Sequence, residues 1–264
     1  MKNYTLITGG SKGIGKALAR ECASRGMNLL LVARQKEGLE EASRNIREEF
    51  KVRVETLQAD LRGKDTPQKI LDWCLREGYP VNVLINNAGI GGTTRFETSS
   101  PEYSSERIMV NVHALVQLTR LFIPELKKYK RSYILNMGSM SAYYPLAYKS
   151  VYSASKAFVM YFTRAINEEL RGSQISITLS NPNGVRTNKG TLDRIDSHGR
   201  LINRFLILEA EKIARITIDK MLMGKLVVIP GFMNRLLILF ARITPRGIRE
   251  RNASRIFRKE LMEK

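Results

Sequence analysis

Short apolar runs alternate with amphipathic segments along most of this 264-residue chain, and this alternation limits the fold more than any other feature. The runs span residues 4–8, 28–33, 52–58, 81–85, 132–137, 175–180 and 226–229. The segments between them repeat their apolar residues at helical spacing. Strands that alternate with helices form a parallel sheet, because each helix carries the chain back across a face of the sheet. The sequence therefore predicts a doubly wound α/β fold.

The length is compatible with one large α/β domain or two small ones. No Pro/Gly/Ser-rich linker or repeat marks a boundary, which favours one domain at 1–230 with an extension at 231–264. The first apolar run begins too close to Met1 for a signal peptide to precede it. Cys22 and Cys74 lie in helical segments without metal-ligand spacing, as reduced core thiols do, so we expect a cytoplasmic protein.

A glycine-rich turn follows the first apolar run and opens the first helix. Glycines permit a tight turn and a close backbone approach, so the free N–H groups of the helix can face a pyrophosphate. The spacing differs from the usual G-x-G-x-x-G fingerprint, and glycine loops are also common as ordinary turns. The expected contacts of a dinucleotide here are Gly9, Ser11, Lys12, Gly13, Ile14 and Gly15.

Two cations lie where a dinucleotide would place its adenosine ribose. The second apolar run ends at Arg34, a position at which NAD-binding folds usually carry an acid. An arginine there accommodates a 2′-phosphate, and Lys12 of the glycine turn can reach the same group. Each can also be a solvated surface charge, but the two together favour NADP(H).

Polar turns follow the third and fourth apolar runs. Asp60-Leu61 comes after one run and Asn87-Ala88-Gly89 after the other, so both lie at the carboxyl ends of predicted strands. Ligands of open α/β sheets bind along that edge, and we expect the adenosine half beside these residues. Ordinary turn chemistry is the alternative explanation for both.

Ser139, Tyr152 and Lys156 are the candidate reactive residues. Tyr152 and Lys156 are four apart on a predicted helix and share one face, so the ammonium can stabilise a phenolate. Ser139 follows the run 132–137, at the edge where ligands bind. The three can converge on one carbonyl or alcohol, although a Tyr-x-x-x-Lys pair also occurs on solvated helix faces. On the helical segment 104–129, Asn111 is the candidate for the site, and we expect His113 to be a packing residue.

Five motifs occur in register: Thr8-Gly9-x-x-x-Gly13-x-Gly15, Asn86-Asn87-Ala88-Gly89, Asn111, Ser139 and Tyr152-x-x-x-Lys156. Over about residues 3–230 the chain resembles the single-domain short-chain dehydrogenase/reductase family. The resemblance implies a Rossmann fold of seven parallel strands and hydride transfer between a nicotinamide and a carbonyl or carbinol carbon. It implies that Tyr152 is the acid/base, that Lys156 tunes it and holds the nicotinamide ribose, and that Ser139 polarises the carbonyl. It also implies a water held by Asn111 and a homodimer or homotetramer.

One departure from the family pattern follows the sixth apolar run. The family usually has Pro-Gly followed by Val-x-Thr, whereas this chain has Asn181-Pro182-Asn183-Gly184-Val185-Arg186-Thr187. Asparagine tolerates a left-handed backbone better than most residues, so the turn can survive. We expect Pro182, Val185 and Thr187 to contact the nicotinamide.

The substrate pocket is expected between a lid at about residues 188–205 and an aromatic rim formed by Tyr143, Tyr144, Leu146 and Tyr148. Tyrosines that merely pack under the lid are the alternative. The net charge of +19 attracts anions of any kind, but no zinc-finger spacing or RNA-binding signature indicates a specific nucleic acid. Apolar walls with a basic mouth suit a hydrophobic carbonyl with an anionic head, such as an acyl thioester or a lipid. His198 is expected to be an exposed lid residue.

The extension at 231–264 has an apolar first part and a basic amphipathic second part that begins at Thr244-Pro245. The apolar part falls short of the roughly 20 apolar residues that span a membrane. The extension is therefore expected to close over the pocket, packing on its own domain or on a partner subunit. Peripheral contact with an anionic membrane is the alternative.

The sequence as a whole predicts an NADP(H)-dependent reductase of a hydrophobic ketone or acyl carbonyl, with a 3-oxoacyl-carrier-protein reductase as a specific alternative. A catalytically silent nucleotide-binding regulator is the alternative outside enzymes. A basic module that binds membranes or nucleic acid is supported by charge alone.

Overall fold

The computed structural model of the chain describes residues 3–186 and 206–262. Seven strands form its main sheet: β1 (Tyr4–Thr8), β2 (Asn28–Ala33), β3 (Val54–Gln58), β4 (Val81–Asn86), β5 (Ser132–Met137), β6 (Ile175–Ser180) and β9 (Val227–Val228). The helices are α1 (Gly13–Ser24), α2 (Lys36–Phe50), α3 (Thr66–Arg76), α4 (Pro101–Ile108), α5 (Ala114–Leu126), α6 (Ser150–Glu169), α9 (Ala210–Leu222), α10 (Phe232–Ile243) and α11 (Arg246–Met262). These elements confirm the predicted alternation of strands and helices.

The strands lie in the order β3-β2-β1-β4-β5-β6-β9, and every neighbouring pair is parallel. The chain winds outward from β1 to β3 in one direction and from β4 to β9 in the other. The order therefore reverses between β1 and β4, and a crevice opens beside such a switch point at the carboxyl ends of the strands. This arrangement confirms the doubly wound, Rossmann-type sheet of seven strands.

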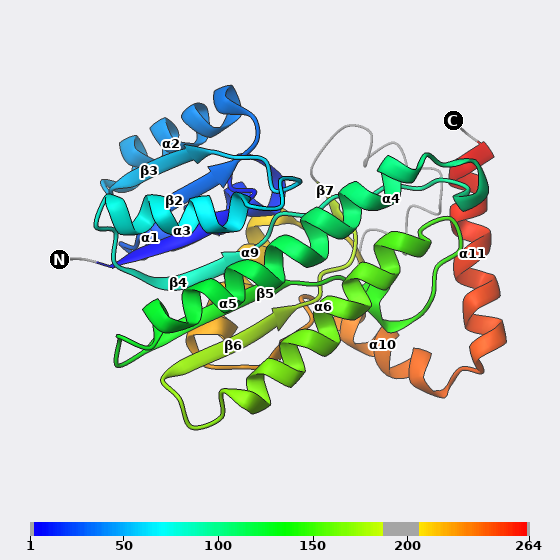
Figure 1. Cartoon of the computed structure of the whole chain (residues 1–264). Helices are drawn as coiled ribbons and strands as arrows, with labels where there is room; N and C mark the ends of the chain where they lie inside the picture. The colour runs from blue at the N-terminus through cyan, green and yellow to red at the C-terminus, as the bar shows by residue number, and fades with distance from the viewer. Residues whose placement is uncertain (1–2, 187–205, 263–264) are drawn as a thin grey trace.

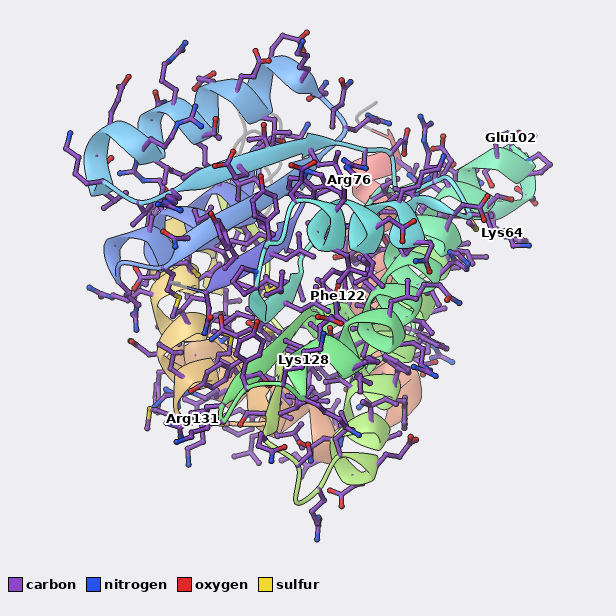
Figure 2. All side chains as sticks on the ribbon, turned by 60° about the vertical axis from the view of Figure 1, so that its left-hand side comes forward. Lys64, Arg76, Glu102, Phe122, Lys128 and Arg131 are labelled. Atoms are coloured by element: carbon purple, nitrogen blue, oxygen red, sulfur yellow. The ribbon has the colours of Figure 1, made fainter. Side chains whose placement is uncertain are left out.

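Helices α1, α2 and α9 cover one face of the sheet, and α3, α5 and α6 cover the other (Figure 1). Strand β2 shows why its sequence is a continuous apolar run: Leu29 and Leu31 pack into one core, and Leu30 and Val32 into the other. Figure 2 shows Phe122 of α5 directed into the interior, with Lys128 and Arg131 at the surface. Cys22 and Cys74 are buried free thiols, as predicted.

The helical segment expected at 104–129 is divided in the structure. Helix α4 ends at Ile108, a π-turn occupies Met109–His113, and α5 begins at Ala114. Pro124 lies inside α5, which ends two residues later. The extra residue in the π-turn rotates the two helices relative to each other, and Asn111 lies at its centre.

The extension forms α10 and α11 beside α6 and the loop before it (Figure 1). A short parallel pair, β7 (Val185–Arg186) and β8 (Leu208–Glu209), lies on either side of residues 187–205 in the sequence. The predicted lid at 188–205, with His198, lies outside the described residues. None of the helices within 3–186 and 206–262 combines the length and the apolar character that crossing a bilayer requires.

Candidate active site

The glycine turn has backbone conformations and close contacts that leave no place for side chains at its glycines. Gly9 and Gly13 have φ values of 69° and 56°, which favour glycine. A Cβ on Gly15 would lie 2.0 Å from the carbonyl oxygen of Gly9 and 2.5 Å from Nδ2 of Asn87. Helix α1 begins at Gly13 without a side-chain cap and without an acid in its first turn. Its N–H groups are thus free to bind an anion.

Thr8 and Asn87 join the ends of β1 and β4 at the switch point. The Thr8 Oγ1 accepts hydrogen bonds from the backbone N–H groups of Asn87 and Ala88, both at 3.1 Å. In return, Asn87 Nδ2 donates to the Thr8 carbonyl oxygen at 2.9 Å. The glycine turn and Asn87-Ala88-Gly89 are therefore held side by side, as the sequence predicts. Thr8 is a structural member of this site that the predicted residues did not include, although the first motif contains it.

Asn111 binds the loop that follows β4. Its Oδ1 accepts from the Ile90 N–H at 2.7 Å, and its Nδ2 donates to the Ile90 carbonyl at 3.1 Å and to Ser155 Oγ at 3.0 Å. Ser155 Oγ donates to the Tyr152 carbonyl at 2.7 Å. The π-turn, the loop after β4 and helix α6 are thus connected through buried side chains. Ser155 could not be singled out from the sequence, since a single serine on a helix carries no pattern.

Lys156 is buried where α6 crosses the end of β5. Its Nζ donates to the Met137 carbonyl oxygen at 2.7 Å. Burial lowers the pKa of the Lys156 ammonium from 10.5 to about 8. A Cβ on Gly89 would lie 3.4 Å from both Lys156 Nζ and Asn111 Oδ1, so the backbone at Gly89 lies close to both polar atoms.

Tyr152 lies one turn before Lys156 and is partly buried. Burial raises the pKa of its phenol, and the neighbouring Ser139 and, to a smaller extent, Ser141 oppose that rise. The sequence predicts instead a phenol whose pKa is lowered by Lys156. The difference arises because the Lys156 ammonium is directed at the Met137 carbonyl and burial is the largest influence on the phenol. Ser141 is a second hydroxyl at this site that the sequence did not single out.

Four buried polar side chains form a chain of hydrogen bonds that ends on helix α6. Asn86 Nδ2 donates to Thr119 Oγ1 at 3.1 Å and to Asn136 Oδ1 at 2.9 Å. Asn136 Nδ2 donates to Thr163 Oγ1 at 3.0 Å. This polar chain runs from α5 through β4 and β5 to α6, the helix that carries Tyr152 and Lys156. It fixes the position of α6 on the sheet.

Lys12 and Arg34 are exposed at the ends of the glycine turn and β2. Asp60 lies near Arg34 but pairs with Arg62 at 2.6 Å. The Arg62 hydrogen bond is the largest influence that lowers the pKa of the Asp60 carboxyl, and the Arg34 charge lowers it further. This edge of the predicted crevice is therefore rich in cations.

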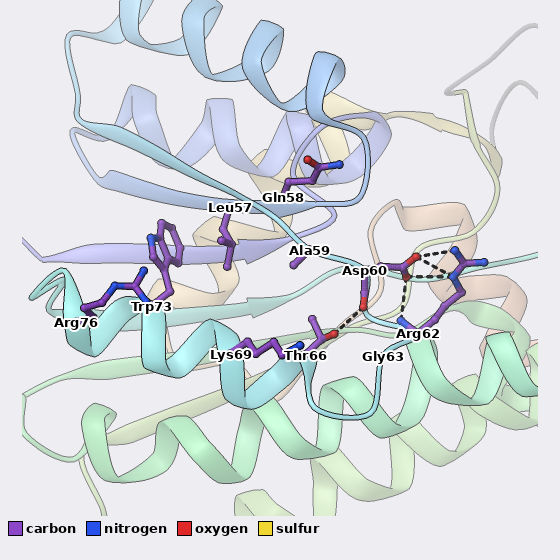
Figure 3. Close-up of a pocket in the computed structure, with 10 residues that line it drawn as sticks. All are labelled: Leu57, Gln58, Ala59, Asp60, Arg62, Gly63, Thr66, Lys69, Trp73 and Arg76. Atoms are coloured by element: carbon purple, nitrogen blue, oxygen red, sulfur yellow. Dashed lines mark hydrogen bonds and ion pairs between the residues drawn. The ribbon is translucent and has the colours of Figure 1, made fainter.

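A cavity of about 710 Å³ opens between the end of β3 and α3. Figure 3 shows Asp60 and Arg62 at one end and Trp73 and Arg76 at the other. It lies on the outer side of Asp60, away from Tyr152 and Lys156. Among the described residues, no group of three or more His, Cys, Asp or Glu side chains is placed to hold a metal ion.

The turn that departs from the family pattern lies beside the extension. The Pro182 carbonyl accepts from the Met140 N–H at 3.0 Å, next to Ser139. Val185 lies in β7, and Thr187 lies outside the described residues. Asn183 Nδ2 donates to Asn234 Oδ1 of α10 at 3.1 Å. The asparagine that departs from the pattern thus links this turn to the extension.

Two of the four rim residues, Tyr144 and Tyr148, contact α11. Leu146 is buried, and the Tyr143 hydroxyl accepts from Asn181 Nδ2 at 3.1 Å. The Arg249 guanidinium lies over Tyr144, with its central carbon 5.6 Å from the centroid of the tyrosine ring. Burial raises the pKa of the Tyr144 phenol. The Tyr148 hydroxyl accepts from Arg258 Nε at 3.2 Å.

Tyr148 also has a φ of 65°, a conformation that is rare for a bulky residue. Its carbonyl accepts from the Thr94 N–H at 2.9 Å, which helps to fix this backbone.

The protein has a doubly wound α/β fold with a glycine turn of the dinucleotide-binding type at its switch point. The Ser139, Tyr152 and Lys156 side chains complete the candidate site. The family model described as short chain dehydrogenase matches residues 3–195 of the chain. The chain therefore belongs to the short-chain dehydrogenase/reductase family. This membership confirms the resemblance found in the sequence.

A very-long-chain 3-oxoacyl-CoA reductase from Rattus norvegicus is 34% identical over 206 residues, which cover 72% of this chain and 64% of that protein. The chain thus spans less than two thirds of the length of this curated relative. A short-chain dehydrogenase from Sphingobium yanoikuyae in complex with NADPH is 31% identical. It superposes with a TM-score of 0.78 over 91% of this chain and 93% of that one. The bulky-bulky ketone specific alcohol dehydrogenase from Comamonas testosteroni is 27% identical, with a TM-score of 0.76 over 91% and 92% of the two chains.

Proposed function

We propose that this protein is an NADP(H)-dependent reductase that converts a hydrophobic ketone or acyl-type carbonyl into a secondary alcohol. The observation that carries the proposal is the Tyr152 phenol. Burial raises the pKa of this phenol, and the neighbouring Ser139 opposes that rise with a smaller influence, so the phenol remains protonated at neutral pH. A protonated phenol beside a buried lysine is suited to donate a proton.

The residues at the switch point fit a dinucleotide. A Cβ on Gly9 or Gly15 would meet Asn87 at 3.0 or 2.5 Å, so only glycines let this turn lie so close to the loop after β4. The uncapped N-terminus of α1 supplies N–H groups for a pyrophosphate. The backbone at Gly89 lies close to Lys156 and Asn111 for the same reason. When bound, the nicotinamide supplies the hydride that reduces the carbonyl carbon.

The chain's own groups perform the remaining steps. The Ser139 hydroxyl donates a hydrogen bond to the carbonyl oxygen and polarises it, and the Tyr152 hydroxyl donates its proton to the same oxygen. Lys156 supplies positive charge beside the phenolate that remains. Asn111 positions the Ile90 backbone and, through Ser155, the turn of α6 that carries Tyr152. Its family role in holding a water is part of this proposal.

The proposed preference for NADP(H) rests on charge. Lys12 and Arg34 are exposed cations at the two places that a 2′-phosphate would reach, and no acid follows β2. The related Sphingobium protein is described in complex with NADPH, which agrees with this preference. The proposed contacts further along the crevice are Asp60, Leu61, Ala88, Pro182, Val185 and Thr187.

The proposed substrate class rests on the rim and on the relatives. We propose Tyr143, Tyr144 and Tyr148, with the buried Leu146, as the aromatic and apolar wall of the pocket, and Arg249 and Arg258 lie against Tyr144 and Tyr148. One relative is named as a reductase of very-long-chain 3-oxoacyl-CoA and another as specific for bulky ketones. An acyl thioester on CoA or a carrier protein therefore fits best.

We propose a single domain at 1–230 with the extension at 231–264, acting as a homodimer or homotetramer in the cytoplasm.

A panel of ketones and 3-oxoacyl thioesters, scored by NADPH oxidation, tests the proposed reaction. Tyr152→Phe removes the proton donor and keeps the ring, so kcat should fall by about 10²- to 10⁴-fold while NADPH binding changes little. Tyr161→Phe is the matched control, because Tyr161 lies on the same helix and is exposed.

Near-normal turnover by Tyr152→Phe would contradict the assignment of the proton donor. Tight NADPH binding without turnover of any carbonyl in the panel would favour the silent regulator instead.

A further inference from the structure

The outer face of α10 is apolar and is not covered by any other part of residues 3–186 and 206–262. Six large apolar side chains on this helix are exposed: Phe232, Met233, Leu237, Leu239, Phe240 and Ile243. Phe240 and Ile243 are 59% and 77% exposed, whereas Asn234 and Ile238 on the opposite side are buried. The helix is thus amphipathic, with its apolar side facing outward. Contiguous apolar patches of this kind mark interaction sites on soluble domains.

Asn234 prevents α10 from turning this face inward. Its Nδ2 donates to the carbonyl oxygens of Pro230 and Leu206 at 2.9 and 3.0 Å, and its Oδ1 accepts from Asn183. A rotation of α10 about its axis would break all three hydrogen bonds of a buried amide. The apolar face is therefore held outward by the structure, and is not the result of a frayed helix end.

Helix α11 does not cover the outer face, because it packs elsewhere. Arg258 bonds to Tyr148, and the Phe257 ring lies 4.8 Å from Lys149 Nζ. Arg249 donates to the Ala241 carbonyl on the inner side of α10 at 2.7 Å and lies over Tyr144. The basic amphipathic helix that the sequence offers for a membrane thus packs on its own domain, and α10 presents the apolar surface.

We propose that the outer face of α10 docks on an anionic lipid membrane, with the helix lying flat in the headgroup region. Residues 232–262 contain eight lysines and arginines against two glutamates, and the whole chain carries a net charge of +19. An apolar helix face beside so many cations is complementary to anionic lipid. A second copy is a poorer occupant, because pairing two such faces would bring two strongly cationic surfaces together.

Docking in this way would place the proposed substrate rim beside the membrane. Helix α11 leads from the end of α10 to Tyr148 and Lys149, so it connects the proposed docking helix with the rim (Figure 1). A lipid-like carbonyl would then reach the rim without crossing bulk water. This consequence rests on the proposed function, whereas the docking rests on the exposed face of α10 and on the positive charge of the chain.

Co-sedimentation of the full chain with vesicles tests the docking. Wild type should bind vesicles that contain phosphatidylglycerol and should leave them at high salt, with little binding to neutral phosphatidylcholine vesicles. Phe240→Ser/Ile243→Ser should weaken binding to anionic vesicles by at least about tenfold, since it removes two of the largest exposed side chains. Leu75→Ser/Met223→Ser is the matched control, because these side chains, on α3 and directly after α9, are 53% and 58% exposed. The control should bind as wild type does.

Two further readouts separate the possible explanations. Circular dichroism confirms that each variant is folded, and NADPH oxidation with a water-soluble ketone should be unchanged in the α10 variant. Wild type that stays in the supernatant with anionic vesicles overturns the proposal, as does an α10 variant that binds like wild type. A dimer that the α10 substitutions dissociate, without any vesicle binding, would assign the face to a second copy and would also overturn it. None of these outcomes bears on the soluble-ketone activity, which tests the proposed function separately.

Discussion

Lys156 illustrates how burial at one residue can set a pH range. Its ammonium donates to the Met137 carbonyl, and burial lowers its pKa to about 8. A lysine with this pKa is mostly charged at pH 7 and mostly neutral at pH 9. The charge that supports Tyr152 in the proposed reaction is therefore lost within an accessible pH range.

We predict that kcat/KM for carbonyl reduction falls as pH rises through about 8, because Lys156 loses its charge there. Well above pH 8 the decrease in kcat/KM should approach tenfold per pH unit. The ratio kcat/KM is the quantity to measure, because it reports the groups of the free enzyme. The raised pKa of Tyr152 keeps the phenol protonated over the same range. A pH–rate profile from 6 to 10 measures this. Lys156→Arg stays charged, so whatever rate it retains should be flat to pH 9.5. A wild-type profile that is flat between pH 7 and 9 would refute the assignment.

Arg34 is the residue whose substitution should change cofactor choice. Arg34→Asp replaces a cation beside the proposed 2′-phosphate with an acid suited to a ribose hydroxyl. We predict that wild type prefers NADPH over NADH by at least about tenfold in kcat/KM, and that the variant narrows or reverses this ratio. Steady-state kinetics with both cofactors measure the ratio. Arg44→Asp, on α2, is a control for the change in net charge.

The residues proposed to react could be singled out in the sequence because their types and spacings are unusual. Ser139, Tyr152 and Lys156 stand at the ends of recognisable elements, and the structure brings Tyr152 together with Ser139. Ser141 and Ser155 were not predictable, because one serine in a loop or a helix carries no periodic signal. Their importance comes from contacts that only the folded chain makes.

At the scale of elements, helix periodicity predicted the segment 104–129 but not its interruption. A π-turn adds one residue without changing the apolar composition, so no pattern marks it. Its consequence is that Asn111 can bind both backbone groups of Ile90. Likewise, amphipathic spacing identified the extension but could not tell that α11 packs on the rim while α10 faces outward.

The connection between α10 and the turn after β6 can be tested at Asn234. Asn234→Ala would leave the Asn183 amide and the carbonyls of Leu206 and Pro230 without this partner. We predict a loss of roughly 1–3 kcal/mol in the free energy of unfolding. Urea denaturation measures it, with Asn252→Ala on the exposed side of α11 as control. A second expected effect is a higher KM for NADPH, since Asn183 lies in the turn proposed to hold the nicotinamide.

At the scale of the whole molecule, the net charge of +19 should influence how anions arrive. We predict that the association rate constant for NADPH falls by about tenfold between 20 and 500 mM salt, because salt screens the field that steers the cofactor. Stopped-flow fluorescence measures the rate constant. NADH, which lacks the 2′-phosphate, should show a shallower dependence. Equal slopes for the two cofactors would argue against steering by this field.

The sequence predicted the strands and helices of the molecule more completely than it predicted how the surfaces of these elements pack. Strands β1, β2, β5 and β6 have the predicted bounds, because nearly all of their residues are buried and most of these are apolar or β-branched. The strand order and the packing of the extension depend on contacts between distant segments, which periodicity does not encode. Residues 188–205 remain a predicted lid.

The polar chain of Thr119, Asn86, Asn136 and Thr163 has a consequence for local opening. It ties two central strands to two helices on the same face through buried hydrogen bonds. Neither α5 nor α6 can separate from the sheet without leaving one of these groups unpaired. The amide protons of β4, β5, α5 and α6 should therefore exchange with deuterium as one cooperative unit, more slowly than those of α10 and α11.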